Sequence, residues 1–406
     1  MSVPLDRLYN FLQDICNQDV LIYRFLPHGS KNLEDCLPLS DQIIHDLNIK
    51  MVCHDQESLC SDEWLQQIQQ YRFKLGHIDS ITTLDRYSEL SDVPFPVLHD
   101  LVNGLATEPY YDHILLLHSE INSKDVKWFE DRGSVAVYWW SHAIIARDWF
   151  RYAEFDPMLT NSRSIQKEFL IYNRAWTGLR EYRIKFTELI LNRNLQNCCQ
   201  LTFNPDDSGQ HWLQHKFINP AFAPTRHDLD QYFQPTMCGS NSSADYISTD
   251  YNQTLIEVVL ETVFDDNKWH LTEKSLRPIA CGHPFILVST PGSLEYLKRY
   301  GFQTFGEYFD ESYDSIQDPV QRLEAVVDLM KSITELSTKQ QQQLQDQLKD
   351  ICKFNKERFF SKEFFDQVVN EFKTNFSQAF DFVASNDSHY YYERNQRLQK
   401  LFFNRG

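Results

Sequence analysis

The chain of 406 residues is long enough for two domains of ordinary size, and its hydrophobic content of 42% excludes a disordered protein. Its net charge of −18 at pH 7 repels nucleic-acid phosphates and anionic membranes, which disfavours a general nucleic-acid binder. Nine cysteines without C-x-x-C spacing predict neither a disulfide framework nor a zinc site.

The expected location is the cytoplasm. The N-terminal sequence lacks the charged start and apolar run of a signal peptide. No stretch approaches the roughly 20 apolar residues that a membrane span requires, so no transmembrane segment is expected.

The first part of the chain alternates predicted strands with predicted helices. The predicted strands are residues 20–26, 49–53, 113–117 and 135–140. The predicted helices include residues 4–18, 62–72, 122–129 and 143–154, and a helix of unspecified ends that runs through Ile43 and Ile44. This alternation predicts βαβ units and therefore an α/β fold with a parallel sheet.

Four of these strands run into a histidine. The four residues are His28, His54, His118 and His142. Because the carboxyl ends of parallel strands meet at one edge of a sheet, the histidines predict a polar surface along that edge. The alternative for each is a half-buried side chain that only makes a hydrogen bond.

A domain boundary is expected near residue 160. Residues 155–165 carry a proline and polar residues without periodicity. A strand at residues 169–172, a helix that extends to Leu191 and a strand at residues 199–203 are predicted beyond it.

The segment from Arg163 to Arg193 is basic within an acidic chain, with seven basic and three acidic residues. The fork of an arginine matches two phosphate oxygens. A strand that runs into an arginine-bearing loop and helix therefore predicts a diphosphate clamp, with a solvated basic helix face as the alternative.

The most informative stretch spans residues 255–301. It predicts a strand that ends before Glu261, a helix that opens at Thr272 and ends by Gly282, a strand at residues 284–288 and a further helix. Ligands of parallel sheets lie beyond the carboxyl ends of the strands, against helix N-termini.

The polar residues expected at that edge are Glu261, Thr272, Glu273, Lys274 and Arg277. A threonine at a helix start with a lysine two residues later can receive a phosphate through backbone N–H groups, the helix dipole and a point charge. A carboxylate there can accept hydrogen bonds from ribose hydroxyls. The alternative is a charged first helical turn that Thr272 caps.

The C-terminal third predicts packed helices. Asp318 caps a long helix that begins at Pro319. Apolar residues recur every four positions further on, which is typical of a buried helix face; they are Phe360, Phe364, Val368, Phe372, Phe376 and Phe380. The stretch 390–405 predicts a terminal helix, with a peripheral membrane helix as the rival. No acidic cluster has the spacing of a metal-binding loop, so no metal is predicted.

A family resemblance is carried by the run TEKSLRPIACGHPFIL, residues 272–287. It resembles the nucleotide-sugar segment of two-domain glycosyltransferases with the GT-B architecture, and is most similar to the fucosyltransferase-like pattern. The following residues, 292–323, resemble the continuation seen in uncharacterised glycosyltransferase-like proteins of bacteria and phages.

The resemblance implies two Rossmann-like domains that face a cleft. The expected ranges are an acceptor-side domain at residues 1–160, a nucleotide-sugar-binding domain at residues 161–350 and C-terminal helices at residues 351–406 that pack back on the domains.

The resemblance also implies site residues in the second domain. Proteins of this group often open that domain with a strand, an Asn-Arg pair and a later His-Arg. Asn173 and Arg174 match the pair, whereas Arg180 and Arg183 both remain candidates for the later arginine, and no histidine precedes either. Together with Lys274, these arginines would hold a diphosphate without an obligatory metal.

The implied activity is transfer of a sugar from a UDP- or GDP-sugar to an acceptor hydroxyl. Glu261 and Glu273 would orient the ribose or the sugar. An inverting enzyme needs a base for the acceptor, for which His118, Glu120 and His142 are the candidates, and a retaining enzyme needs none.

The acceptor is left open between a glycan precursor, a protein and a modified DNA base. The net charge of −18 disfavours DNA. The sequence does not indicate an oligomeric state.

The main alternative function is a catalytically idle relative that binds a nucleotide or a partner. The presence of Arg174, Glu273 and Lys274 argues against it. The sequence contains no G-x-G-x-x-G after a strand, no P-loop and no G-x-S-x-G, so dehydrogenases, P-loop enzymes and hydrolases lose their main support.

Overall fold

The computed structural model describes the residues of six segments, which are 20–24, 50–54, 114–130, 135–159, 163–233 and 245–385. The predicted helices at residues 4–18, 43–44 and 62–72, His28 and the stretch 390–405 lie outside these segments. The chain divides into two compact units: unit 1 comprises Met1–Ser141 and Val368–Gly406, and unit 2 comprises His142–Gln367.

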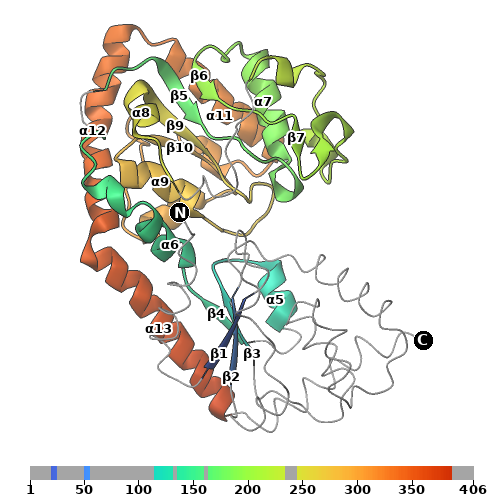
Figure 1. Ribbon diagram of the computed structural model, residues 1–406, viewed down its shortest axis with the longest axis vertical. Helices are drawn as coiled ribbons and strands as arrows, with labels where there is room; N and C mark the ends of the chain where they lie inside the picture. Colours follow the sequence, from blue (N-terminus) through green and yellow to red (C-terminus); the bar gives the residue numbers. More distant parts are fainter. Residues whose placement is uncertain are drawn as a thin grey trace. The chain divides into compact units, whose positions relative to one another are not determined.

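Unit 1 contains a four-stranded parallel sheet (Figure 1). Its strands, in spatial order, are β1 (Val20–Arg24), β2 (Lys50–His54), β3 (Ile114–His118) and β4 (Val135–Tyr138). These strands coincide with the four predicted runs to within one or two residues, and the predicted parallel pairing is confirmed.

Helix α5 (Lys124–Glu130) connects β3 to β4. The hydroxyl oxygen of Ser123 accepts hydrogen bonds from the backbone N–H groups of Asp125 and Val126, at 3.2 and 3.3 Å. Ser123 is therefore the residue that caps this helix, as one of the two predicted candidates.

The second part of helix α13 (Lys362–Ser385) belongs to unit 1. The rings of Trp139 and Phe372 lie 4.9 Å apart, and the Asn375 amide donates to the carbonyl of Tyr138 at 2.8 Å. Phe372 and Phe376 are buried, which confirms for these two residues the predicted apolar face.

Unit 2 contains a second four-stranded parallel sheet, with the spatial order β10-β9-β5-β6. Its strands are β5 (Lys167–Ile171), β6 (Cys199–Leu201), β9 (Thr254–Leu260) and β10 (Phe285–Val288). Every residue of β9 and β10 is buried, which explains why both strands are mostly apolar, with Thr254 and Glu257 as the polar exceptions in β9.

Helices cover both faces of this sheet. The helices of unit 2, which includes all but the first residue of α6, are α6 (Ser141–Trp149), α7 (Tyr182–Asn192), α8 (Ser248–Gln253), α9 (Glu273–Cys281), α10 (Ser293–Arg299), α11 (Pro319–Thr334) and α12 (Thr338–Phe360). Figure 1 shows α9 and α12 on one face and α7 and α11 on the other. The α/β class and the parallel sheet are thus as predicted.

Helix α9 has the predicted ends. The hydroxyl oxygen of Thr272 accepts from the N–H of Lys274, and Gly282 has a φ of 64° in the left-handed region that glycine tolerates best. The N–H groups of Gly282 and His283 then bond to the carbonyls of Ile279 and Pro278.

The loop that follows β6 contains short elements. These are the antiparallel strands β7 (Asp206–Asp207) and β8 (Gln210–His211) and the 3₁₀ helices Trp212–Gln214, Pro220–Phe222 and Leu229–Gln231. Carboxylates of α7 and its N-cap hold it: Glu181 accepts from the N–H groups of Ile218 and Asn219, and Glu188 from those of Thr225 and Arg226.

The division between the units falls at Ser141 and His142, whereas the sequence placed it near residue 160. Helix α6 belongs almost entirely to unit 2, because the guanidinium of Arg147 donates to the carbonyls of Phe359, Phe360 and Ser361. The carbonyls of Phe359 and Phe360 lie at the end of α12, where helical partners are lacking. Helix α12 packs on α9 and so belongs to unit 2 rather than to a separate extension.

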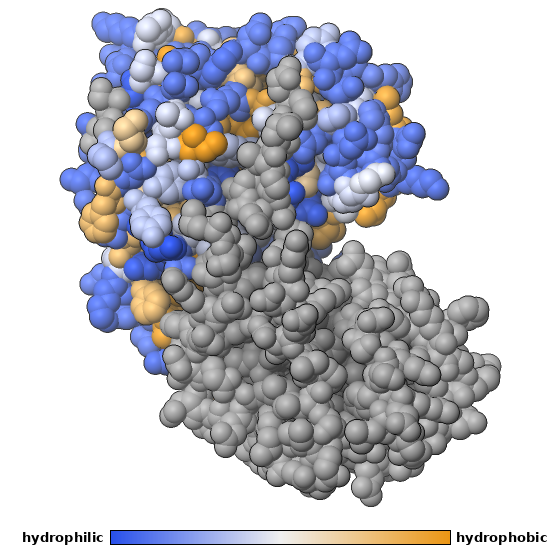
Figure 2. Space-filling view, in the orientation of Figure 1, coloured by the Kyte–Doolittle hydropathy of each residue, from blue (hydrophilic) through white to orange (hydrophobic). Residues whose placement is uncertain are grey.

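The visible face of the described residues is mostly hydrophilic, with hydrophobic side chains in scattered positions (Figure 2). No helix within the described segments is long and apolar enough to cross a membrane.

Candidate functional site

The sheet of unit 2 changes direction between two central strands. The chain moves from β5 to β6 on one side and then returns to β9 and β10 on the other. Open α/β sheets bind ligands beyond the carboxyl ends of the strands at such a reversal. The residues that follow these ends are Asn173 and Arg174 after β5, and Glu261 and Thr272–Lys274 after β9. The fold therefore brings two separately predicted segments to one edge.

The Arg183 side chain ties the two loops of this edge together. Its guanidinium is buried and donates to the carbonyls of Ala175 at 2.8 Å, Leu260 at 2.6 Å and Glu261 at 3.1 Å. The neighbouring Tyr182 hydroxyl also donates to the Glu261 carbonyl, at 2.6 Å. These contacts give Arg183 a role in shaping the edge, in place of the predicted phosphate contact.

The Glu261 side chain occupies the N-terminus of α9. Its buried carboxylate accepts hydrogen bonds from the N–H groups of Thr262, Thr272 and Ser275 at 3.1–3.2 Å, and from the hydroxyls of Thr272 and Ser275. A carboxylate here compensates the positive end of the helix dipole. The N–H groups of Thr272 and Ser275 at this helix start therefore already have an internal anionic partner.

Glu273 lies between two basic side chains. One carboxylate oxygen lies 2.9 Å from the Lys274 ammonium nitrogen, and the other lies 3.4 Å from Nδ1 of His142. Burial raises the pKa of the Glu273 carboxyl, but the charge of Lys274 and the contact with His142 outweigh burial and hold this pKa well below its usual range. Glu273 is thus an anion at neutral pH.

A second histidine completes what we call the Glu273 cluster, which consists of His142, His270, Glu273 and Lys274. The rings of His142 and His270 meet edge to face with their centroids 5.3 Å apart. The Lys274 ammonium also donates to the Thr272 hydroxyl at 3.1 Å, and about a quarter of its side chain is exposed. A carboxylate accepts up to about four hydrogen bonds, so Glu273 retains capacity for the hydroxyls of a ligand.

Arg174 is the most available arginine of the edge. Its side chain is half-buried, and its guanidinium makes no hydrogen bond with any described residue. Its backbone carbonyl accepts from the Asn204 amide at 2.8 Å, which fixes the loop. Asn173 is buried and donates to the Thr187 hydroxyl at 3.2 Å, so it supports the loop from below.

Two further predicted arginines have internal contacts. Arg180 is half-buried, and its Nε donates to the carbonyl of Thr177 at 3.3 Å. Arg277 is buried and pairs with Glu257 at 2.6 Å and with the Tyr251 hydroxyl at 3.1 Å. Because its guanidinium joins α9 to β9, the structure gives Arg277 a structural role rather than a ligand contact.

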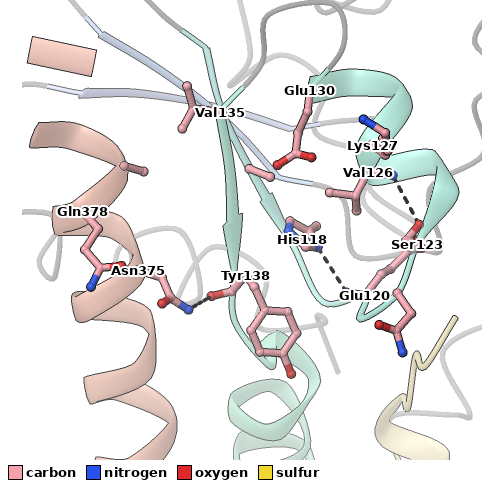
Figure 3. A pocket seen from close by; sticks show the side chains of 13 residues that line it. His118, Glu120, Ser123, Val126, Lys127, Glu130, Val135, Tyr138, Asn375 and Gln378 are labelled. Carbon is pink, nitrogen blue, oxygen red and sulfur yellow. Dashed lines mark hydrogen bonds between the residues drawn. The ribbon is translucent and has the colours of Figure 1, made fainter. Parts of the chain in front are cut away.

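In unit 1, His118 and Glu120 line a pocket of about 560 Å³. Figure 3 shows β4 between α5 and α13, with residues of all three elements around the pocket. The polar residues that line it, besides those two, are Asn122, Ser123, Lys127, Glu130, Tyr138, Asn375 and Gln378. The pocket thus presents amides, a carboxylate pair and a tyrosine ring, which together can bind hydroxyl groups.

His118 is neutral in this pocket. Burial lowers the pKa of the imidazole from 6.5 to about 4. Its Nδ1 accepts the N–H of Glu120 at 3.3 Å, so the proton of the neutral ring lies on Nε2 (Figure 3). His118 is therefore arranged as a hydrogen-bond donor. The Glu120 carboxylate accepts a hydrogen bond from the Ser123 hydroxyl and lines the same pocket.

His270 and Ser275 were not among the residues predicted for this site. His270 lies two residues before the helix cap and Ser275 directly follows the T-E-K run, so proximity to the helix start was the only signal for either. His142, which was predicted as a base, instead contacts Glu273 of the same unit. Among the described residues, no group of three or more His, Cys, Asp or Glu side chains is arranged to hold a metal ion.

The two parallel four-stranded sheets, with polar residues at the carboxyl edge of the unit 2 sheet, make this an α/β protein. The sequence matches no protein-family model and no curated protein.

Proposed function

We propose that the protein is a glycosyltransferase of the GT-B type, built from two Rossmann-like domains, that uses a UDP- or GDP-sugar. The observation that carries the proposal is the reversal between β5 and β9, which brings Arg174 and the Glu273 cluster to one carboxyl edge. A nucleotide with anionic phosphates and hydroxyl-rich sugars needs cations and carboxylates at one place. This edge holds both.

The roles within the donor site follow from the available groups. Arg174 and Lys274 offset the charge that develops on the departing diphosphate, without an obligatory metal. The ionised Glu273 accepts hydrogen bonds from ribose or sugar hydroxyls. Glu261 and Arg183 act only by holding the edge in shape.

The pocket of unit 1 supports acceptor binding in the proposal. Glu120 is the group we assign as base if the reaction inverts, and neutral His118 donates a hydrogen bond to the acceptor. A hydroxylated glycan precursor or a protein side chain suits this pocket, whereas the net charge of −18 disfavours DNA.

A nucleotide screen by thermal unfolding tests the donor site. A ligand that binds only the folded protein stabilises it by about 2.7 kcal/mol at 100 times its Kd, so a cognate nucleotide gives a clear shift. We expect UDP or GDP to raise the melting temperature, and Arg174→Ala and Lys274→Ala to abolish the rise. The matched control is Lys339→Ala, which removes an exposed lysine of α12 and leaves the rise intact. No shift with any nucleotide sugar would contradict the proposal.

One observation favours the alternative of a catalytically idle nucleotide-binding protein. The N-terminus of α9, which often binds phosphate in such folds, is filled by Glu261. Release of UDP or GDP from the sugar conjugate distinguishes the two functions. An enzyme releases the nucleotide, and an idle protein binds the conjugate without cleaving it.

A further inference from the structure

A second pocket of about 530 Å³ lies in unit 2 at the other end of α9. Its walls are Cys281 and Gly282 at the end of α9, one face of α12, and the side chains of Glu154, Leu159 and Arg163. Helix α9 has nine residues, and a rise of about 1.5 Å per residue separates its two ends by about 13 Å. This pocket is therefore distinct from the Glu273 cluster.

The side chains that line the pocket carry a net charge of +1 in a strongly acidic protein. The basic residues that line it are Arg163, Lys349, Lys353 and Lys356, and the acidic residues are Glu154, Asp346 and Glu357. Lys353 lies 3.8 Å from Glu357 on the exposed surface of α12, so the charges of these two side chains offset each other. Three cations and two carboxylates remain around the pocket.

Arg163 lacks an acidic partner. One of its N–H groups donates to the carbonyl of Gly282 at 2.7 Å, and no carboxylate of the described segments lies within 4.0 Å of its guanidinium. Burial lowers the pKa of its guanidinium. Because half-buried and buried charges are normally paired, this arginine has capacity for an external anion.

Lys356 is packed against the same helix end. Its ammonium donates to the carbonyl of Ala153 at 2.7 Å, and its Cδ lies 3.3 Å from the position of a Cβ at Gly282. An anion between Arg163 and Lys356 would therefore contact the C-terminal end of α9 closely.

We propose that this pocket binds a small molecule that carries a phosphate group, through Arg163 and the lysines of α12. The arginine fork suits two phosphate oxygens and the lysines add point charges. A volume of about 530 Å³ exceeds that of phosphate alone and lies in the range of metabolite sites. The ligand is thus a phosphorylated metabolite rather than the free ion.

Calorimetric titration of the full chain at constant ionic strength tests the proposal. The ligands are inorganic phosphate and a sugar monophosphate, each up to about 10 mM, ten times the 1 mM Kd of a weak site. We expect the sugar phosphate to bind more tightly than phosphate. Lys349→Gln, which alters an exposed side chain, should weaken binding about tenfold, and Arg163→Gln more strongly.

Three variants separate this site from the donor edge. Lys339→Gln, on α12 outside the pocket, and the double variant Arg174→Ala with Lys274→Ala should bind the sugar phosphate as the unaltered protein does. Arg163→Lys, which keeps the charge, should retain part of the affinity. Loss of binding in the double variant, unchanged binding in both Arg163→Gln and Lys349→Gln, or no binding at about 10 mM would overturn the proposal.

Discussion

The carboxylate of Glu261 accepts hydrogen bonds from both the backbone N–H and the hydroxyl of Thr272, at 3.1 and 2.7 Å. Glu261, which follows strand β9, and Thr272, which ends the loop before α9, are thereby held together at the start of α9. A phosphate at this edge has to be held by side-chain cations, since two of the first N–H groups of α9 already have an anionic partner.

Glu261→Gln should destabilise unit 2 by about 3 kcal/mol, because hydrogen bonds to a buried charged group contribute about 1.5–3 kcal/mol each and the amide presents an N–H where an acceptor is required. Chemical denaturation measures the loss. The control Glu335→Gln changes an exposed carboxylate and should alter stability by less than about 0.5 kcal/mol. Full stability of Glu261→Gln together with lost nucleotide binding would instead assign Glu261 to the ligand.

Arg174 and Arg183 should separate binding from stability. Arg183→Ala removes the buried donor of the Ala175 and Leu260 carbonyls, whereas the Glu261 carbonyl keeps the Tyr182 hydroxyl. We therefore expect a loss of about 3 kcal/mol in unfolding free energy. Arg174→Ala should cost less than about 0.5 kcal/mol and remove nucleotide binding. Denaturation and nucleotide titration of both variants check this. Equal destabilisation by the two substitutions would contradict the division of roles.

Acid should destabilise the protein below about pH 6.5 through two buried histidines. Burial lowers the pKa of His118 to about 4, and burial and then Arg163 hold the pKa of His283 well below 6.5. The unfolded chain takes up protons below about pH 6.5 and the folded chain does not, so stability falls with decreasing pH. For His118 the loss reaches about 3 kcal/mol at pH 4.

Unfolding free energies measured between about pH 7 and pH 4 test this, and His118→Gln should flatten the slope for unit 1. Glu273 affects the unfolding free energy at lower pH than the histidines do. Its lowered pKa gives stability that is present above about pH 4.5 and is lost only as the pH falls further. A slope that begins only below pH 4.5 would therefore point to Glu273 and against the histidines.

Two glycines in the left-handed region form a matched pair. Gly292 has a φ of 82°, and a Cβ there would lie 3.0 Å from the Trp269 ring, whereas Gly178 has a φ of 62° with open space around it. Gly178→Ala should cost about 1 kcal/mol from backbone strain alone, and Gly292→Ala about 3 kcal/mol because the ring must also move. Equal losses of unfolding free energy in the two variants would show that the Trp269 ring moves aside without a measurable cost.

Local signals were enough to predict the strands and the ends of α9. Mostly apolar runs form β9 and β10, and Thr272 and Gly282 mark the start and the end of the helix. These features depend on neighbours in sequence. The parallel pairing followed because helices separate the strands.

Contacts between distant residues could not be predicted in the same way. Nothing near Arg183 in the sequence indicates that the carbonyls of Leu260 and Glu261 accept its N–H groups, so it was grouped with the phosphate candidates. Likewise, Arg147 contacts the end of α12 more than 200 residues later, and this contact moves the division between the units to Ser141. The sequence shows that such residues are charged, but it does not show which distant residues they contact in the fold.

The pairing of Trp139 with Phe372 has a consequence for synthesis on the ribosome. Unit 2 is one continuous segment, whereas unit 1 draws on both ends of the chain. Emerging strands of unit 1 must wait for α13 until more than 200 further residues have been translated. At about 5–20 residues per second, that delay lasts about 10–50 seconds, during which the first sheet is exposed to chaperones and to misassembly.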